Sequence, residues 1–358
     1  MERLVARYKE NNRQKHLLWM DALRVISMFA VVTLHITATG YKGSVQGSYE
    51  WIFCYILCLL TRFAVPVFVM ISGALFLSPE KQLMNGNIWR KYVKRLMVVF
   101  FFWSAMYAFV ETLKNYSLTD YRYYLSFVKR FFEGHYHMWY IYMIAFLYII
   151  TPFLRRIAED KRLLQLFLLY AFLFGSCAEL FCIIPYIGDT FSSIVRDLHC
   201  EVVSGYVGYY CLGFYLTKYG ITKKHERYVH TITAIAVTLL IIFVFFQRNK
   251  TFGVEDIQSE TLPFAVFMSI SIFVVFKNIK EKIERSSFFS SIVTVVSPLT
   301  LGIYVIHPAI NIVLRKLGLY ALSFDPVISV PLSVILVVLI SGIISWIIKR
   351  IPVFKNIV

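Results

Sequence analysis

The hydrophobic positions of this chain fall into long, nearly uninterrupted runs that short polar segments separate. A transmembrane helix needs about 20 mostly apolar residues to cross the hydrocarbon core of a bilayer. Runs of that length recur along the whole chain, so we predict an all-α polytopic membrane protein with about ten spans. The predicted spans are residues 17–39, 49–77, 92–112, 137–154, 163–184, 200–217, 229–247, 261–279, 293–314 and 327–348.

Composition supports this prediction and excludes a soluble protein. The 358 residues are 58% hydrophobic, with a mean hydropathy of +0.65, which leaves too little polar surface for a soluble domain of this size. A net charge of +16 can also indicate a nucleic-acid-binding protein. However, 25 of the 37 basic residues fall in segments on the N-terminal side of the predicted bundle and 10 in segments on the other side. This bias predicts cytosolic N- and C-termini, and the lipid bilayer rather than nucleic acid as the partner.

The domain organisation that follows is simple. We expect a basic cytosolic tail over residues 1–16, a transmembrane domain over 17–350 and a short cytosolic tail over 351–358. The outer segment 113–136 is rich in Tyr and Phe and is expected to form an interfacial helix over the outer mouth. Because no large soluble domain is apparent, any chemistry is expected in a central polar cavity of the bundle.

The first predicted span carries three groups that lipid disfavours, namely Asp21, Arg24 and His35. At 100° per residue, Arg24 and His35 lie within roughly 20° on one helix face and about 16 Å apart along the axis. Asp21 lies one turn before Arg24, where the two side chains can pair. Charged groups cost about 2.5–3.5 kcal/mol each within a span, so they normally face a cavity and indicate function. The alternative is that the charged pair snorkels to the cytosolic boundary while His35 bonds a neighbouring carbonyl.

A second polar stripe lies in the ninth predicted span. Ser297, Thr300, Tyr304, His307 and Asn311 recur at spacings of three and four residues, which places them on one helix face. In a membrane this face must meet a cavity or other helices. Hydrogen bonding between helices is the alternative interpretation.

The first-span pattern Asp-x-Leu-Arg-x10-His resembles the opening signature of the acyltransferase-3 family of bacterial membrane acyltransferases. Further segments resemble family segments in the same order along nearly the whole chain. These segments are "RFAVPVFVMISGALF" (62–76), "WRKYVKRL" (89–96), "HMWYIYMIAFLYIITPFLRR" (137–156), "GYVGYYCLGFYL" (205–216) and "SPLTLGIYVIHPAI" (297–310). The overall pattern is most similar to members that O-acetylate sugars of surface polysaccharides.

The resemblance implies an O-acyltransferase of the bacterial cytoplasmic (inner) membrane. Its donor would be cytosolic acetyl-CoA, its acceptor a hydroxyl of an extracytoplasmic or lipid-linked glycan, and no metal would be required. His35 would act as catalytic base or as carrier of a covalent acetyl group, and both routes stay open. Arg24, fixed by Asp21, would bind the phosphate or pantetheine arm of the donor or hold an acid. His307, with Tyr304, would orient the acceptor or donate to the oxyanion.

The remaining candidates are basic and aromatic. Arg62 lies about half-way along the second predicted span, where a cavity role and a structural ion pair are alternatives. The basic cluster that follows is a candidate for the nucleotide phosphates, although the positive-inside pattern would also place charge there. In addition to Arg24, the expected donor-binding residues are Arg62, Arg90, Lys91, Lys94 and Arg95. The expected acceptor-binding residues are His137, Trp139, Tyr140 and Tyr304.

The main alternative function is a membrane transporter of a small polar substrate such as an amino acid, because polar stripes also line substrate pathways. The inverted repeats of many transporters are not evident in the sequence. A purely structural membrane protein fits less well, because it would not need buried charged and imidazole groups. A homo-oligomer is compatible with all of these functions.

Overall fold

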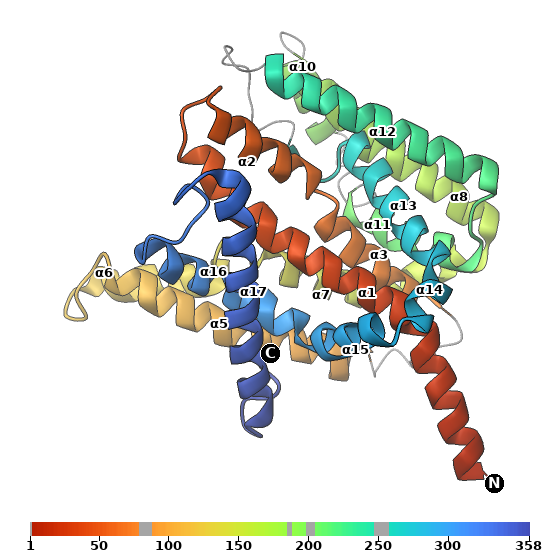
Figure 1. The fold of residues 1–358 in the computed structure, drawn as a ribbon, viewed down its shortest axis with the longest axis horizontal. Helices are drawn as coiled ribbons and strands as arrows, with labels where there is room; N and C mark the ends of the chain where they lie inside the picture. Colours follow the sequence, from red (N-terminus) through yellow and green to blue (C-terminus); the bar gives the residue numbers. More distant parts are fainter. Residues whose placement is uncertain (1, 79–87, 185–187, 198–204, 247–257) are drawn as a thin grey trace.

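The computed structural model describes residues 2–78, 88–184, 188–197, 205–246 and 258–358, and every regular element among them is a helix (Figure 1). This confirms the all-α class. Within the described residues, eight helices are long and apolar enough to cross a membrane, as expected for a polytopic membrane protein. They are Leu18–Lys42, Tyr49–Phe76, Arg90–Leu113, Trp139–Glu159, Lys161–Cys182, Lys223–Phe246, Ser287–Lys316 and Pro326–Arg350.

Some of these spans are single helices, and others are assembled from consecutive helical elements. Two of the connecting pieces are π-helical (η1, η2) and one is a 3₁₀ turn (η6). The elements are α1 (Glu2–Lys42), α2 (Tyr49–Leu60), α3 (Ala64–Phe76), η1 (Ile88–Val93), α5 (Lys94–Leu113), α6 (Tyr121–Glu133), α7 (Trp139–Glu159), α8 (Lys161–Tyr170), η2 (Ala171–Cys177), α9 (Ala178–Cys182), α10 (Gly188–Asp197), α11 (Tyr206–Lys218), α12 (Lys223–Phe246), α13 (Pro263–Asn278), α14 (Lys280–Arg285), α15 (Ser287–Val296), η6 (Ser297–Leu299), α16 (Thr300–Lys316) and α17 (Pro326–Arg350).

Two of the ten predicted spans are shorter than a membrane-crossing helix. Helices α11 and α13 have 13 and 16 residues, and at 1.5 Å per residue they cover about 20 and 24 Å of a roughly 30 Å hydrocarbon core. The start of the predicted span 200–217 lies outside the described residues. Protein groups satisfy the end of α11: Lys277 Nζ donates to the carbonyl oxygens of Leu216 and Thr217, at 2.5 and 3.2 Å. The C-terminal end of α11 therefore has a partner on α13 for two of its carbonyl groups.

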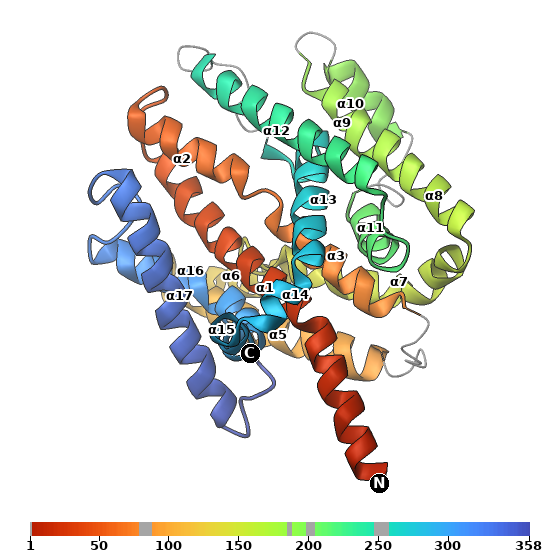
Figure 2. The ribbon, with the colours of Figure 1, turned by 45° about the vertical axis from the view of Figure 1, so that its right-hand side comes forward.

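Helix α1 runs through the middle of the bundle (Figures 1 and 2). It contacts α2, α3, α13, α16 and α17, and side chains such as Ala22, Leu23 and Ile36 are almost completely buried. The helix begins at Glu2 and therefore continues through the predicted tail 1–16. Within the bundle, the polar side chains of α1 face other helices.

The second predicted span is interrupted between α2 and α3. Pro66 has no backbone N–H with which to bond the Arg62 carbonyl four residues earlier. Thr61 Oγ1 donates back to the carbonyl oxygens of Leu57 and Cys58, at 2.9 and 3.0 Å. Arg62 therefore lies at a junction between two helices rather than in the middle of one.

Helices α3 and α11 cross in direct backbone contact. A Cβ atom on Gly73 would lie 1.7 Å from the Tyr210 carbonyl oxygen, and one on Gly213 would lie 1.9 Å from the Met70 carbonyl oxygen. Only glycine fits at both positions, as is common where membrane helices approach closely. The crossing fixes α3, which forms one wall of the cavity described below.

Helix α6 lies within the segment 113–136, where an interfacial helix was expected, and packs back along the C-terminal half of α5. Ser104 Oγ on α5 donates to the Phe131 carbonyl oxygen on α6 at 2.5 Å. Gly134 then adopts a φ of 75°, in the left-handed region that favours glycine, and ends α6. The chain between α6 and α7 is thereby carried into the interior, where His137 is buried.

The C-terminal segment 351–358 packs against α5. Trp103 Nε1 donates to the Ile357 carbonyl oxygen at 2.8 Å, and Arg95 Nη2 donates to the Val358 oxygen at 3.0 Å. Both chain ends lie in the lower part of Figures 1 and 2. The two termini are thus on the same side of the bundle.

Candidate active site

The candidate site contains two groups of polar residues. The first is the charged end, which we define as Asp21, Arg24 and Ser297. Arg24 Nη1 lies 2.5 Å from Asp21 Oδ1, so the pairing predicted from their spacing is present. Ser297 Oγ on η6 donates to the same carboxylate oxygen at 2.8 Å and lies 3.4 Å from Arg24 Nη1. The Arg24 and Asp21 side chains are 28% and 34% exposed. The pair therefore borders accessible space while a second helix holds it in place.

A cavity of about 310 Å³ begins at the charged end. It lies between α1, α3, α5, α7 and α16. Four of the predicted site residues line it, namely Arg24, Arg95, Tyr140 and Tyr304. Its polar lining residues are Arg24, Ser72, Tyr92, Arg95, Tyr140, Tyr148, Ser297, Thr300 and Tyr304.

The second polar group is the histidine cluster, which we define as His35, His135, His137 and His307. The His35 and His307 rings stack with centroids 5.3 Å apart, and His137 meets His307 edge-on at 5.4 Å. Tyr136 packs against His35 with ring centroids 5.1 Å apart. Within the described residues, neither ring nitrogen of His35 forms a protein hydrogen bond. The contacts of His35 with Tyr136 and His307 are thus ring contacts.

Tyr304 joins the cavity to the histidine cluster. It lines the cavity, its hydroxyl donates to the His137 carbonyl oxygen, and its ring lies 5.3 Å from that of His137. Val31, one turn before His35 on the same face of α1, also lines the cavity. Tyr304 thus contacts both regions, whereas the four residues of the histidine cluster do not line the cavity themselves.

Comparison with known proteins identifies the family of this chain. A family model described as an acyltransferase domain, of the acyltransferase-3 type, matches residues 17–348. The chain belongs to the acyltransferase-3 family. No curated protein and no solved structure matches it. The match spans both polar groups of the site, and it supports a membrane acyltransferase in general rather than a particular donor or acceptor.

Within this acyltransferase, the predicted donor-binding residues separate into two sets. Arg95 lines the cavity together with Arg24. Arg90, Lys91 and Lys94 are exposed on η1 and the start of α5 and do not line the cavity. The basic cluster therefore contributes one side chain to the cavity and leaves three at the surface.

Arg62 is not brought to the cavity. Its Nη2 donates to Gln258 Oε1 at 2.6 Å, and its Nη1 lies 3.8 Å from Glu260 Oε1. Tyr206 donates its hydroxyl to Glu260 at 2.5 Å, and Trp139, which is 41% exposed, packs on Tyr206. Arg62 is thus in a structural ion pair, one of its two predicted alternatives, and Trp139 lies beside that ion pair rather than in the cavity.

Burial changes the pKa of Glu260, the acid of this ion pair. Glu260 lies before α13, outside the spans, and burial raises its carboxyl pKa against the opposing effects of the Tyr206 hydrogen bond and Arg62. This group was not predicted from the sequence.

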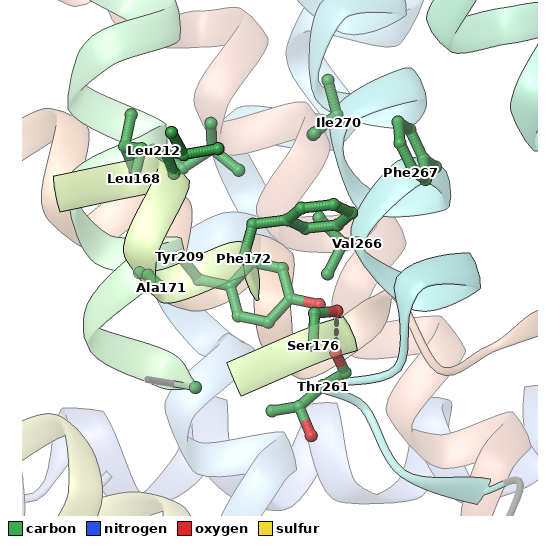
Figure 3. Close-up of a pocket in the computed structure, with 13 residues that line it drawn as sticks. Leu168, Ala171, Phe172, Ser176, Tyr209, Leu212, Thr261, Val266, Phe267 and Ile270 are labelled. Atoms are coloured by element: carbon green, nitrogen blue, oxygen red, sulfur yellow. Dashed lines mark hydrogen bonds between the residues drawn. The ribbon is translucent and has the colours of Figure 1, made fainter. Parts of the chain in front are cut away.

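A second, apolar pocket of about 330 Å³ lies between η2, α11 and α13 (Figure 3). Apolar side chains such as Phe172, Leu212 and Val266 dominate its walls. Its polar edge is satisfied internally, because Ser176 donates its hydroxyl to the Thr261 carbonyl oxygen (Figure 3). This pocket presents no group suited to acyl transfer, so the cavity at the charged end is the better candidate.

The sequence did not indicate Glu111 or Tyr136, which contact the histidine cluster. The available signal for Glu111 was its position as the one acidic residue of the predicted span 92–112. Among the described residues, no group of three or more His, Cys, Asp or Glu side chains has metal-binding geometry.

Proposed function

We propose that this protein transfers an acetyl group from cytosolic acetyl-CoA to a hydroxyl of an extracytoplasmic or lipid-linked glycan in the bacterial cytoplasmic membrane. The observation that carries the proposal is the arrangement on α1. Arg24 borders a cavity at one end of the helix face, and His35 lies in the histidine cluster about three turns further along. Such an enzyme must join a thioester from one side of the membrane to a hydroxyl from the other.

The cavity has features that suit the donor. Arg24 and Arg95 provide two guanidinium groups, which are well suited to phosphate and to polar amides. Its volume of about 310 Å³ is at the lower end of the range for small-ligand sites. It therefore suits the acetyl-pantetheine arm, with the nucleotide closer to the surface where the basic cluster lies.

The chemistry assigned to His35 is general base catalysis. The acceptor oxygen forms a bond to the acetyl carbonyl carbon while its proton passes to a neutral nitrogen of His35. The carbon–sulfur bond breaks, and the sulfur of the leaving CoA takes the proton from His35. His35 suits this role because no protein hydrogen bond from the described residues occupies its nitrogens. In the alternative route His35 carries the acetyl group covalently, and the same atoms balance over two steps.

Proteoliposomes test the proposal. Acetyl-CoA is enclosed, methyl glycosides of glucose, galactose, rhamnose and N-acetylglucosamine are added outside, and free CoA thiol is measured. We expect acceptor-dependent thiol release by the wild type and His225→Ala, which changes an exposed histidine, and its loss in His35→Ala. Absence of thiol with every acceptor, together with solute uptake that survives His35→Ala, would indicate a transporter instead.

A further inference from the structure

A chain of polar contacts runs from a carboxylate on α5 into the histidine cluster. Glu111 Oε1 lies 3.2 Å from His135 Nε2, and His135 Nδ1 lies 2.9 Å from His137 Nδ1. Tyr107 stacks on the His135 ring with centroids 4.3 Å apart, and its hydroxyl donates to the Val305 carbonyl oxygen at 2.8 Å. Both histidines are buried, at 9% and 1% exposure. This series of contacts therefore holds the two imidazole rings in place.

These contacts determine where the hydrogens lie. A carboxylate only accepts, so His135 Nε2 carries a hydrogen and donates it to Glu111. In a neutral His135 ring, Nδ1 is then an acceptor, and the hydrogen between the two histidines belongs to His137 Nδ1. His137 Nε2 is left with a bare lone pair. This nitrogen is buried and has no hydrogen-bond partner among the described residues.

The neutral state of His135 is the favoured one. His135 lies between α6 and α7, outside the spans, and burial lowers its pKa. Glu111 opposes this effect, while Lys114 and Arg130 add to it.

His307 reaches the same state by a different contact. Its Nδ1 lies 2.7 Å from the Tyr304 carbonyl oxygen, which only accepts, so Nδ1 carries the hydrogen. Its Nε2 is also buried without a partner among the described residues. In the neutral ring this nitrogen cannot donate to an oxyanion, which favours an accepting role for His307. Leaving a buried acceptor unsatisfied is unfavourable, so two such nitrogens, one of them on the ring that stacks on His35, call for a functional explanation.

We infer that Glu111 and His135 are positioning residues for the transfer reaction. They hold His137 with a bare Nε2 against His307, whose own bare Nε2 belongs to the ring that stacks on His35. The two lone pairs stabilise the positive charge that His35 carries during transfer. The inference rests on the proposed function. In the transfer step the acceptor proton moves to His35 and then to the CoA sulfur, so the chain gains and loses no proton overall.

Matched variants separate this role from simple structural support. Glu111→Gln keeps the shape and one hydrogen-bond acceptor but removes the charge, and His135→Phe keeps the stacking on Tyr107 but removes both nitrogens. Glu111 also pairs with Arg130, with Nη1 and Oε2 2.5 Å apart. Arg130→Gln therefore breaks the same ion pair from the other side while leaving the contact with His135.

Kinetics give the first readout, as CoA thiol release from the proteoliposomes described above. We expect kcat to fall about 10–100-fold in Glu111→Gln and His135→Phe, as for loss of a hydrogen bond to a charged group, with KM for acetyl-CoA nearly unchanged. Arg130→Gln is expected to stay close to the wild type. Equal losses in Glu111→Gln and Arg130→Gln, or wild-type kcat in His135→Phe, would overturn the inference while the proposed function stands.

Tautomers give a second readout that does not depend on turnover. In ¹⁵N-histidine-labelled protein in bilayers, solid-state NMR distinguishes a bare ring nitrogen from one that carries hydrogen. We expect a bare Nε2 for His137, assigned by its loss in His137→Ala, and a mixed tautomer in His135→Phe. A protonated Nε2 in the wild type at neutral pH would overturn the inference. If the wild-type protein releases no thiol, the proposed function is wrong, and so is the role of Glu111 and His135 in transfer. The spectrum still decides whether Glu111 and His135 fix the tautomer of His137.

Discussion

The charged end and the histidine cluster each include residues from one face of α1, but they differ in how their polar groups are satisfied. At the charged end, Arg24 and Ser297 both contact the Asp21 carboxylate. In the histidine cluster, His137 and His307 each keep a buried nitrogen without a partner among the described residues. Charged side chains that border a cavity are suited to holding a ligand, whereas bare imidazole lone pairs are suited to accepting a proton. We therefore propose that the first region binds the donor and that the second transfers the proton.

The sharpest way to break this comparison is His35→Ala. Removal of the general base is expected to lower kcat by about 10²–10⁴-fold. KM for acetyl-CoA should change little, because Arg24 is about 16 Å away along the helix. Steady-state CoA release measures both constants. A large rise in KM with kcat retained would place donor binding at the histidine cluster and contradict the assignment.

Arg24→Met tests the opposite end. Loss of charge-assisted hydrogen bonds worth about 1.5–3 kcal/mol is expected to raise KM for acetyl-CoA about 10–100-fold. Because this change leaves Asp21 without its cation, the double variant Asp21→Asn/Arg24→Met controls for an unpaired carboxylate. Arg227→Met, an exposed position on α12 that does not line the cavity, should behave like the wild type. If Arg24→Met lowers kcat and leaves KM unchanged, the charged end takes part in the chemical step rather than in donor binding.

Gly73→Ala tests whether the α3–α11 crossing fixes the wall of the cavity that α3 forms. The added Cβ would meet the Tyr210 carbonyl, and overpacking of this kind costs about 1–3 kcal/mol. We expect a lower Tm in detergent together with reduced activity. Gly342→Ala is the matched control, since the nearest atom to its Cβ is Ile303 Cδ1 at 3.7 Å. Equal Tm values for both variants would show that the crossing has room to relax.

Ser297→Ala should give the smallest effect. It removes a neutral hydrogen bond to Asp21 but leaves the ion pair with Arg24, so a net loss of about 0.5–1.5 kcal/mol is expected. That corresponds to a rise of about 2–10-fold in KM for acetyl-CoA in the CoA release assay. A drop in kcat as large as that of His35→Ala would mean that the two regions are not separate in function.

Much of this molecule follows from the sequence. Apolar run length predicts the helical class, and the eleven-residue spacing between Arg24 and His35 places both on one face of α1. The i,i+3 spacing of Asp21 and Arg24 predicts their ion pair, because it is a contact within one helix. These features depend on local geometry alone.

Contacts between distant segments were not predicted. Glu111 and His135 meet because α6 folds back along α5, and hydropathy carries no information on that packing. Arg62 was expected at the donor site, but the helix break beside Pro66 turns it toward Gln258 and Glu260. The lengths of α11 and α13, 13 and 16 residues, were not predicted either, since an apolar run does not reveal where a helix begins within the bundle.

The central claim is that one acetyl group passes from the charged end to the histidine cluster across the bundle. The most direct test uses wild-type protein in vesicles of one orientation, with [¹⁴C]acetyl-CoA on the cytosolic side only and methyl glycosides on the opposite side only. The account predicts labelled acetyl ester on the glycoside with the wild type and none with His35→Ala. Label that appears only when donor and glycoside share one side of the membrane, or that persists in His35→Ala, would contradict it.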